Sequence, residues 1–273
     1  MPGFWCAKFE MSKETKDGSD WVKSNNPTGS VETSSTLRAV SKPGISSWRE
    51  IGITKCYANS YNYDRVKESH LMKNSEWGAV AYLTHSQFGR DEQEVNINNN
   101  NDYLTGYSGE GPDVTKSSDT VKTYDYKNTI YGVKASSTGN IYGIYDLSGG
   151  AYEYIAGFYS ESTSAYITSI KSVSEWEKYA TEYTNNTNSP KGIEIYNVGK
   201  TGDATKEVNI GYVENNYRSW NKDYSHYVYS ESPFFIRGGC ITDGISGGIF
   251  CSYRTNGINI PNVSFRVVMC LQN

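Results

Sequence analysis

The sequence predicts an α+β fold with two helices, a small irregular antiparallel sheet and long loop insertions. Three observations lead to this class. Residues 4–12 alternate apolar and polar side chains, residues 74–89 repeat apolar side chains at helical spacing, and residues 264–271 have the composition of a strand. Because the chain has 273 residues and no strong linker, we expect a single domain over residues 1–273.

The first part of the chain is expected to hold one strand and one helix. The run "FWCAKFEMS", residues 4–12, alternates as a strand does. Residues 13–45 are polar and rich in Ser, Thr and Asn, which predicts a loop. Residues 46–61 favour a helix with Ser46 or Ser47 as its N-cap. Its apolar positions are Trp48, Ile51, Cys56 and Tyr57.

The strongest helix signal is "NSEWGAVAYLTHSQFG", residues 74–89. Asn74 or Ser75 is a suitable N-cap, and Gly89 is a suitable end. The expected apolar face consists of Trp77, Val80, Ala81, Thr84 and Phe88.

The second half alternates short apolar runs with long polar segments. Residues 91–130 are predicted to be a loop insertion, and residues 151–158 a strand. A second insertion, residues 159–232, contains a candidate short helix at 173–183 and a candidate hairpin at 202–216. Such long insertions are typical of chains in which loops carry the function.

Composition restricts the partners. The net charge is −4 without a basic cluster, which argues against nucleic acid. No apolar run reaches the length of a membrane span, so we expect no direct membrane insertion by this chain.

We expect no cofactor. The five cysteines show no CxxC spacing, so a zinc site or redox pair is unsupported, and the three histidines stand alone. Asp146 and Asn140 are the candidate ligands of a structural calcium ion. Calcium needs several oxygens at one point, and we expect these two residues to cap turns instead.

Several motifs together resemble the formylglycine-generating-enzyme branch of the C-type lectin fold. "GNIYGIYDLSGGAYEY", residues 139–154, resembles the signature that precedes that family's central strand. "FIRGG" and "SFRVV" resemble its closing pair, and "GFWCAKFE" its opening strand. "HLMKNSEWGAVAYLTHSQFG" resembles the second helix of a bacterial and phage branch. The resemblance covers about half of the chain and leaves the two insertions without a counterpart.

Fold does not settle function, and the resemblance leaves three readings. Formylglycine-generating enzymes use a cysteine pair after R-G-G near a copper site, but the spacing of Cys240 and Cys251 does not match that pair. Calcium-dependent lectins carry E-P-N, Q-P-D or W-N-D, which are absent here. The third reading is the variable protein of a diversity-generating retroelement, in which adenines of the gene are miscopied and codons keep their final pyrimidine.

The terminal segment favours the third reading. Codons altered in this way cannot encode Lys, Glu, Gln, Met or Trp, and none of these types occurs between Ser232 and Val268. Glycines, Phe250 and the motif Ser264-Phe265-Arg266 form a regular frame, and erratic side chains fall between its members. Phe250, Phe265, Val267 and Val268 are expected to point into the core.

We therefore expect a non-catalytic binding protein with a variable region over residues 237–266, displayed on a virion or a bacterial cell surface. Its partner would be an unknown protein or cell-surface ligand. Tyr253 and Arg254 are the best anchor candidates, because these types dominate interface hot spots. The predicted variable, solvent-facing positions are Cys240, Ile241, Thr242, Asp243, Ile245, Cys251, Tyr253, Arg254, Thr255, Ile258, Ile260, Pro261 and Val263.

Overall fold

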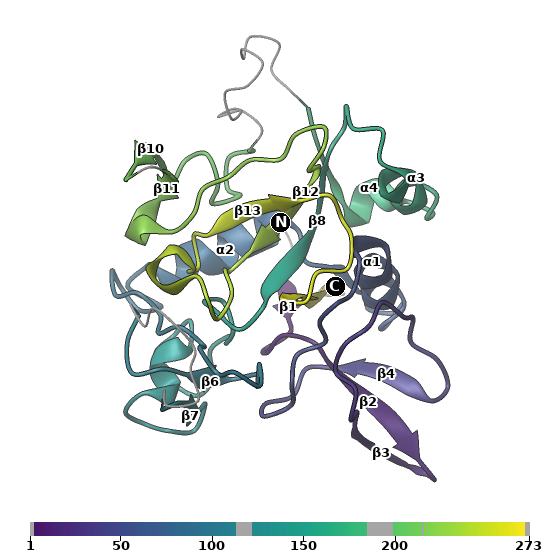
Figure 1. The fold of residues 1–273 in the computed structure, drawn as a ribbon, viewed down its shortest axis with the longest axis horizontal. Coiled ribbons are helices and arrows are strands. Elements are labelled where there is room, and N and C mark those ends of the chain that lie inside the picture. The colour runs from purple at the N-terminus through teal and green to yellow at the C-terminus, as the bar shows by residue number, and fades with distance from the viewer. Residues whose placement is uncertain (1–2, 113–121, 185–198, 215, 271–273) are drawn as a thin grey trace.

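The structure, a computed structural model, describes residues 3–112, 122–184, 199–214 and 216–270 (Figure 1). These ranges form a mixed α+β structure with four α-helices and several small sheets, and they contain no barrel. The predicted α+β class is confirmed, but four α-helices are present where two were predicted, and the central sheet combines parallel with antiparallel pairs where an antiparallel sheet was predicted. None of the described helices is long and apolar enough to span a bilayer.

A five-stranded sheet occupies the centre of the molecule. It consists of β8 (Tyr152–Tyr159), β9 (Thr181–Tyr183), β12 (Phe234–Arg237), β13 (Ser252–Thr255) and β14 (Val263–Phe265), in the order β13-β12-β8-β14, with β9 also paired to β8. Every residue of β8 is buried, which suits its run of aromatic and β-branched side chains. The strand predicted at 151–158 is confirmed with a shift of one residue.

A second sheet joins the two ends of the described chain. β1 (Phe4–Cys6) pairs antiparallel with β15 (Val267–Cys270), which also pairs with β5 (His70–Leu71). The predicted terminal strand is therefore two strands, β14 and β15, separated at Arg266. The predicted first strand is likewise short, because it ends at Cys6.

The segment predicted as a loop, residues 13–45, contains a three-stranded antiparallel sheet, so that prediction is wrong. The sheet consists of β2 (Ser12–Asp17), β3 (Asp20–Lys23) and β4 (Leu37–Val40). The buried residues of β2 are polar and include Lys13 and Glu14, whose charged ends have hydrogen-bond or ion-pair partners. β2 therefore lacks the alternation of apolar and polar side chains by which a strand is predicted from sequence.

Both predicted helices exist with different ends. α1 spans Ile53–Tyr61 and begins after Gly52 rather than at Ser46 or Ser47, because residues 46–51 run in extended and bridged backbone. α2 spans Asn74–Thr84 and is preceded by Lys73, whose N–H donates to the Glu76 carboxylate at 2.8 Å.

The predicted core face of α2 is confirmed except at its end. Trp77, Val80, Ala81 and Thr84 are buried, but Phe88 is 75% exposed. The helix ends four residues before Phe88, so helical spacing no longer places that side chain on the buried face.

The two predicted insertions carry structure of their own. The first contains β6 (Tyr107–Ser108) and β7 (Tyr124–Asp125), and η1 (Gly132–Ala135) follows it. The second contains α3 (Ala165–Lys171), α4 (Trp176–Tyr179), β9, the hairpin of β10 (Asn209–Val213) and β11 (Asn216–Ser219), and η2 (Trp220–Lys222). The predicted short helix is confirmed with narrower bounds, and the predicted hairpin lies later in the chain than expected, because β11 extends to Ser219.

A buried ion pair connects the sheets. Arg266 donates to the Glu153 carboxylate from Nε at 2.9 Å and from Nη2 at 2.5 Å, and both side chains are fully buried. Arg266 also donates from Nη1 to the Ala7 carbonyl at 2.7 Å and from Nη2 to the Tyr145 carbonyl at 2.8 Å. The Arg266 side chain therefore connects three segments to the junction of β14 and β15. These segments are β8, the residues after β1 and the loop before β8.

Replacing Arg266 by Met should test this connection. The change leaves the Glu153 carboxylate buried without a cation, so we expect a loss of about 3–5 kcal/mol in the free energy of unfolding, measured by urea denaturation. Lys55→Gln is the control, because it breaks an exposed pair with Glu32 and should cost about 1 kcal/mol or less. Equal losses in the two variants would contradict the connecting role.

The buried carboxyl of Glu10 makes stability depend on pH. Burial and the neighbouring Asp146 carboxylate raise the pKa of Glu10 well above its usual range. The folded protein thus keeps this proton where the unfolded chain has lost it, so stability falls as pH rises above about 4.3 towards the folded pKa. Glu10→Gln retains the oxygen that accepts the Ala151 N–H. We expect urea denaturation to show that this variant is more stable than wild type at pH 8, with the difference shrinking at pH 4.

Glu76→Gln should show the opposite sign and is the matched control. Burial acts to raise the pKa of Glu76, but the hydrogen bond from His70 and the nearby Lys73 prevail and lower it. This carboxylate therefore stabilises the fold above the ordinary glutamate pKa, and that contribution is lost as pH falls. The same pH trend in both variants would refute the assignment.

Candidate ligand-binding face

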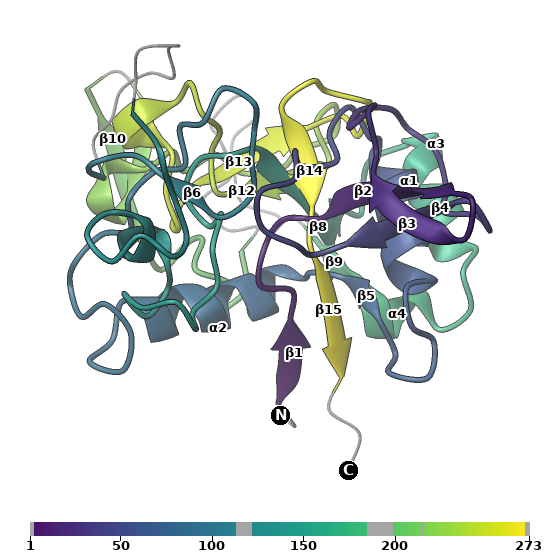
Figure 2. The ribbon, with the colours of Figure 1, turned by 90° about the horizontal axis from the view of Figure 1, so that it is seen from below.

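Two loops of the terminal segment lie together on one side of the molecule. The first connects β12 to β13 and includes η3 (Gly244–Ser246), and the second connects β13 to β14. They meet where the Asn262 amide lies 3.1 Å from the Cys240 thiol. Both loops are in the upper half of Figure 2, whereas β1 and the end of β15 point to the bottom. We call the solvent-facing part of these loops and β13 the variable face.

The predicted variable positions divide into two groups. Eight are exposed or half-buried on the variable face, namely Thr242, Asp243, Ile245, Tyr253, Arg254, Ile258, Ile260 and Pro261. Among the apolar ones, Ile245 is 37% and Ile258 45% exposed. The other five are buried, namely Cys240, Ile241, Cys251, Thr255 and Val263, so the expectation that they face solvent is wrong.

The five positions are buried for the same physical reason, which is that the chain turns towards the core at each of them. Ile241 donates its N–H to the Gly150 carbonyl at 3.0 Å. Val263 begins β14 and pairs with Tyr152. Thr255 ends β13 opposite Phe234, and Cys251 directly precedes that strand. An irregular path has no fixed period, so spacing alone cannot separate inward from outward side chains.

The first loop folds back on itself in a way that requires glycine. Gly239 has φ 73°, and a Cβ there would lie 2.4 Å from the Gly247 Cα. The Asp243 carboxylate closes the same turn by accepting the Cys240 N–H at 2.8 Å. Asp243 is therefore partly a structural residue of the loop and partly a solvent-facing one.

The two thiols of the variable region are not activated. Burial raises the pKa of the Cys251 thiol well above its usual range, and the Asp223 carboxylate adds to the shift. Burial and the Asp243 carboxylate likewise raise the pKa of Cys240. A nucleophilic cysteine needs a lowered pKa and access to solvent, and these two have neither.

Aromatic rings line one side of the variable face. The centroid of Tyr253 lies 4.5 Å from that of His226, 5.8 Å from Tyr224 and 6.2 Å from Tyr152. The two predicted anchors are both half-buried there. Arg254 lies 4.9 Å from the Tyr229 ring and donates to a backbone carbonyl. Tyr224 and Tyr253 are half-buried, whereas His226 and Tyr152 are buried against them, so the two half-buried tyrosines offer amphipathic rings of the kind enriched in recognition sites.

Sequence reasoning missed several residues that border this face, because they come from the two insertions and from the segment before α1. They are Arg49, Tyr103, Tyr217, Arg218, Tyr224 and His226. The signal that could have indicated most of them is the tyrosine-rich composition of residues 212–229. The prediction for the second insertion was a loop with one candidate short helix and one candidate hairpin.

The candidate calcium ligands Asp146 and Asn140 accept hydrogen bonds from N–H groups of the protein. Asp146 accepts N–H groups from Gly106 at 2.8 Å, Asn98 at 3.0 Å and Glu10 at 3.3 Å. N–H donors thus engage both oxygens of this carboxylate, which makes it poorly suited to hold a calcium ion. Asn140 accepts the Tyr142 N–H at 2.9 Å, as the cap of a turn does. Across the described ranges, no three His, Cys, Asp or Glu side chains converge on a point that could hold a metal ion.

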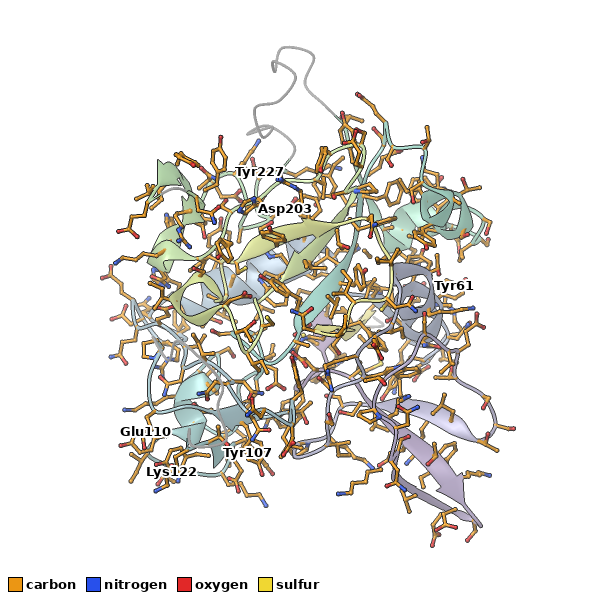
Figure 3. The ribbon with its side chains drawn as sticks, in the orientation of Figure 1. Tyr61, Tyr107, Glu110, Lys122, Asp203 and Tyr227 are labelled. Carbon is orange, nitrogen blue, oxygen red and sulfur yellow. The ribbon has the colours of Figure 1, made fainter. Side chains whose placement is uncertain are left out.

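Arg237 supports the first loop from behind. It is fully buried, lies 5.6 Å from the Trp77 ring and donates to the Ala204 carbonyl at 2.8 Å. The adjacent Asp203, labelled in Figure 3, accepts the Tyr183 hydroxyl at 2.7 Å. The Arg-Gly-Gly motif therefore begins the loop from a fixed position in the core.

Thiol labelling provides a test of the buried cysteines. Iodoacetamide at pH 8 should leave Cys240 and Cys251 unmodified in native protein and alkylate both in urea, as read by mass spectrometry of tryptic peptides. The half-buried Cys270 serves as an internal reference and should react faster than either when folded. Rapid alkylation of Cys251 in the native state would contradict its placement.

Comparison with known proteins adds no relative. No family model matches this chain, and no curated protein matches it in sequence.

Proposed function

We propose that this chain is a non-catalytic binding protein with the C-type lectin fold, of the formylglycine-generating-enzyme type. Its terminal region would be diversified by adenine-directed mutagenic retrohoming. The variable face would recognise an unknown protein or cell-surface ligand, with the protein displayed on a virion or a bacterial surface.

The architecture supports the fold proposal. The opening and closing strands that the resemblance identifies pair with each other as β1 and β15. The helix segment that the resemblance identifies corresponds to α2, and α3 and α4 fall in the second insertion. The signature segment leads directly into β8 at the centre of the main sheet.

The observation that carries the functional proposal is the separation of side chains within one segment. Phe250, Phe265 and Arg266 are fully buried and hold the fold. Eight of the thirteen predicted variable positions reach solvent on one face, and codons of the retroelement type can encode all of them. Surface changes of this kind usually alter stability by about half a kcal/mol or less, so many different faces are compatible with one fold.

The competing functions find less support. An oxidase of the same fold needs a reactive thiol pair, whereas burial raises the pKa of both candidate thiols. A calcium-dependent lectin needs converging oxygens, and N–H donors already engage the Asp146 carboxylate.

The neighbouring DNA provides the decisive experiment. We expect a near-copy of the segment that encodes residues 232–269, differing mainly at adenines and lying beside a reverse transcriptase gene. Related strains should differ in this protein mainly at the exposed positions of the variable face. Strain variants that change evenly along the chain, with no template copy, would refute the proposal.

Mutational tolerance should follow the same division. Simultaneous randomisation of Thr242, Ile245, Ile258 and Pro261 should leave most clones folded, with melting temperatures close to wild type. Phe265→Ala should cost about 3–5 kcal/mol, because the side chain is fully buried against Trp48. Unfolding of most library clones would show that these positions hold the fold after all.

A further inference from the structure

Two arginines outside the variable region flank the variable face, and each stacks on a tyrosine. The guanidinium carbon of Arg49 lies 3.8 Å from the Tyr103 ring centroid. That of Arg218, on β11, lies 4.9 Å from the Tyr224 ring centroid. Stacking fixes the plane of a guanidinium, so little side-chain entropy is lost when its remaining donors bind a ligand.

Each arginine also touches one of the two variable loops. Arg49 donates from Nη1 to the Pro261 carbonyl at 2.8 Å. Arg218 donates from Nη1 to the Ser246 hydroxyl at 2.7 Å and to the Lys222 carbonyl at 3.0 Å. Both guanidinium groups are therefore held at the border between the constant scaffold and the variable loops.

The donors of these two arginines are only partly used. The Nε atoms of Arg49 and Arg218 are buried without a hydrogen-bond partner. Among the hydrogen bonds and ion pairs of the described residues, the two arginines use only Nη1, and only with neutral oxygens. Arg266, in contrast, is paired with a carboxylate. Arg218 interacts electrostatically with the Asp223 carboxylate, but neither guanidinium forms an ion pair among the described residues. A charged, oriented fork without an ion-pair partner is suited to bidentate binding of a carboxylate.

We propose that Arg49 and Arg218 form a constant anchor for an acidic segment of a partner protein, while the variable positions select which protein is bound. This inference rests on the proposed function and assigns the partner's chemistry. Because neither arginine belongs to residues 237–266, the anchor would be the same in every diversified version. Charge complementarity supports the assignment, since oriented arginines are common anchors in interfaces.

Exposed apolar side chains favour a protein over an acidic polysaccharide. Ile245 on the face is 37% exposed, and Ile210 and Tyr212 on the adjoining β10 are 54% and 62% exposed. The ring of Tyr212 lies 5.1 Å from that of Tyr217, which continues through His226 to Tyr253. Such an apolar surface next to fixed cations suits the mixed composition of a protein interface.

The test uses immobilised poly-L-glutamate as the acidic peptide and hyaluronan as the carboxylated polysaccharide. We expect the full chain to bind poly-L-glutamate at low salt and the Arg49→Gln/Arg218→Gln variant to bind it at least about tenfold more weakly, since charged hydrogen bonds are lost. The charge-matched control is Lys67→Gln/Lys178→Gln. These lysines pair with Asp64 and Glu68, away from the variable face, and their loss should change binding less than about twofold.

Further variants separate anchoring from loop support. Arg49→Lys/Arg218→Lys keeps the charge but loses the planar fork, so binding should be weaker than wild type while the melting temperature stays unchanged. Three results would overturn the inference. The first is equal weakening of binding in Arg49→Gln/Arg218→Gln and in Lys67→Gln/Lys178→Gln, and the second is unaltered binding in the arginine variants. The third is stronger binding of the full chain to hyaluronan than to poly-L-glutamate. If the DNA contains a template copy but the arginine variants give one of these results, the arginine anchor is rejected and the proposed function stands. If the arginines bind poly-L-glutamate as expected but no template copy exists, the proposal of diversification is rejected and the anchor stands.

Discussion

The pairing of Arg266 with Glu153 is the interaction on which the rest of the structure depends. It lies where β14 gives way to β15, so it connects the main sheet with the sheet that joins the two ends of the described chain. All the neighbours that receive its donors come from segments distant in sequence. Taking two charges out of water is costly unless the geometry is nearly ideal. Such a pair therefore stabilises one arrangement of the strands and penalises alternatives in which either charge is left alone.

The arrangement of the variable face follows from that fixed centre. Residues of the second insertion pack beside the first variable loop and hold its backbone through hydrogen bonds. The Asp223 carboxylate accepts the Phe250 N–H at 2.9 Å, and the Ser219 hydroxyl bonds the Phe250 carbonyl at 3.1 Å. The Tyr224 N–H bonds the Ser246 carbonyl at 2.8 Å. These bonds use only the backbone of the variable region, so they are indifferent to the side chains that the loop carries. A loop held in this way keeps its path when its exposed residues change.

The sequence allowed prediction where a single element is buried along its length. β8 and the core face of α2 were both predictable, because a mostly apolar, aromatic-rich run or a 3.6-residue period signals them. β2 was not, because its buried side chains are polar and are satisfied by partners distant in sequence, such as Arg38 for Glu14. The same limitation applies to the variable region. Ile241 and Ile245 are equally apolar, yet one is buried and the other exposed, since a glycine-containing turn lies between them.

Because Cys240 and Cys251 are buried, substitutions at these two positions would have a different effect from substitutions at the exposed positions of the variable region. Both thiols lie in the layer that joins the loops to the core, where Cys240 contacts Thr242 Oγ1 at 3.2 Å and the Asn262 amide at 3.1 Å. A small, weakly polar side chain fits such a layer, and Ser or Ala could replace it with little change in volume. Substitution there would act on the loop's shape, whereas substitution at Ile245 or Pro261 would act on its chemistry. The face therefore offers two kinds of variation, and only the outer one is independent of stability.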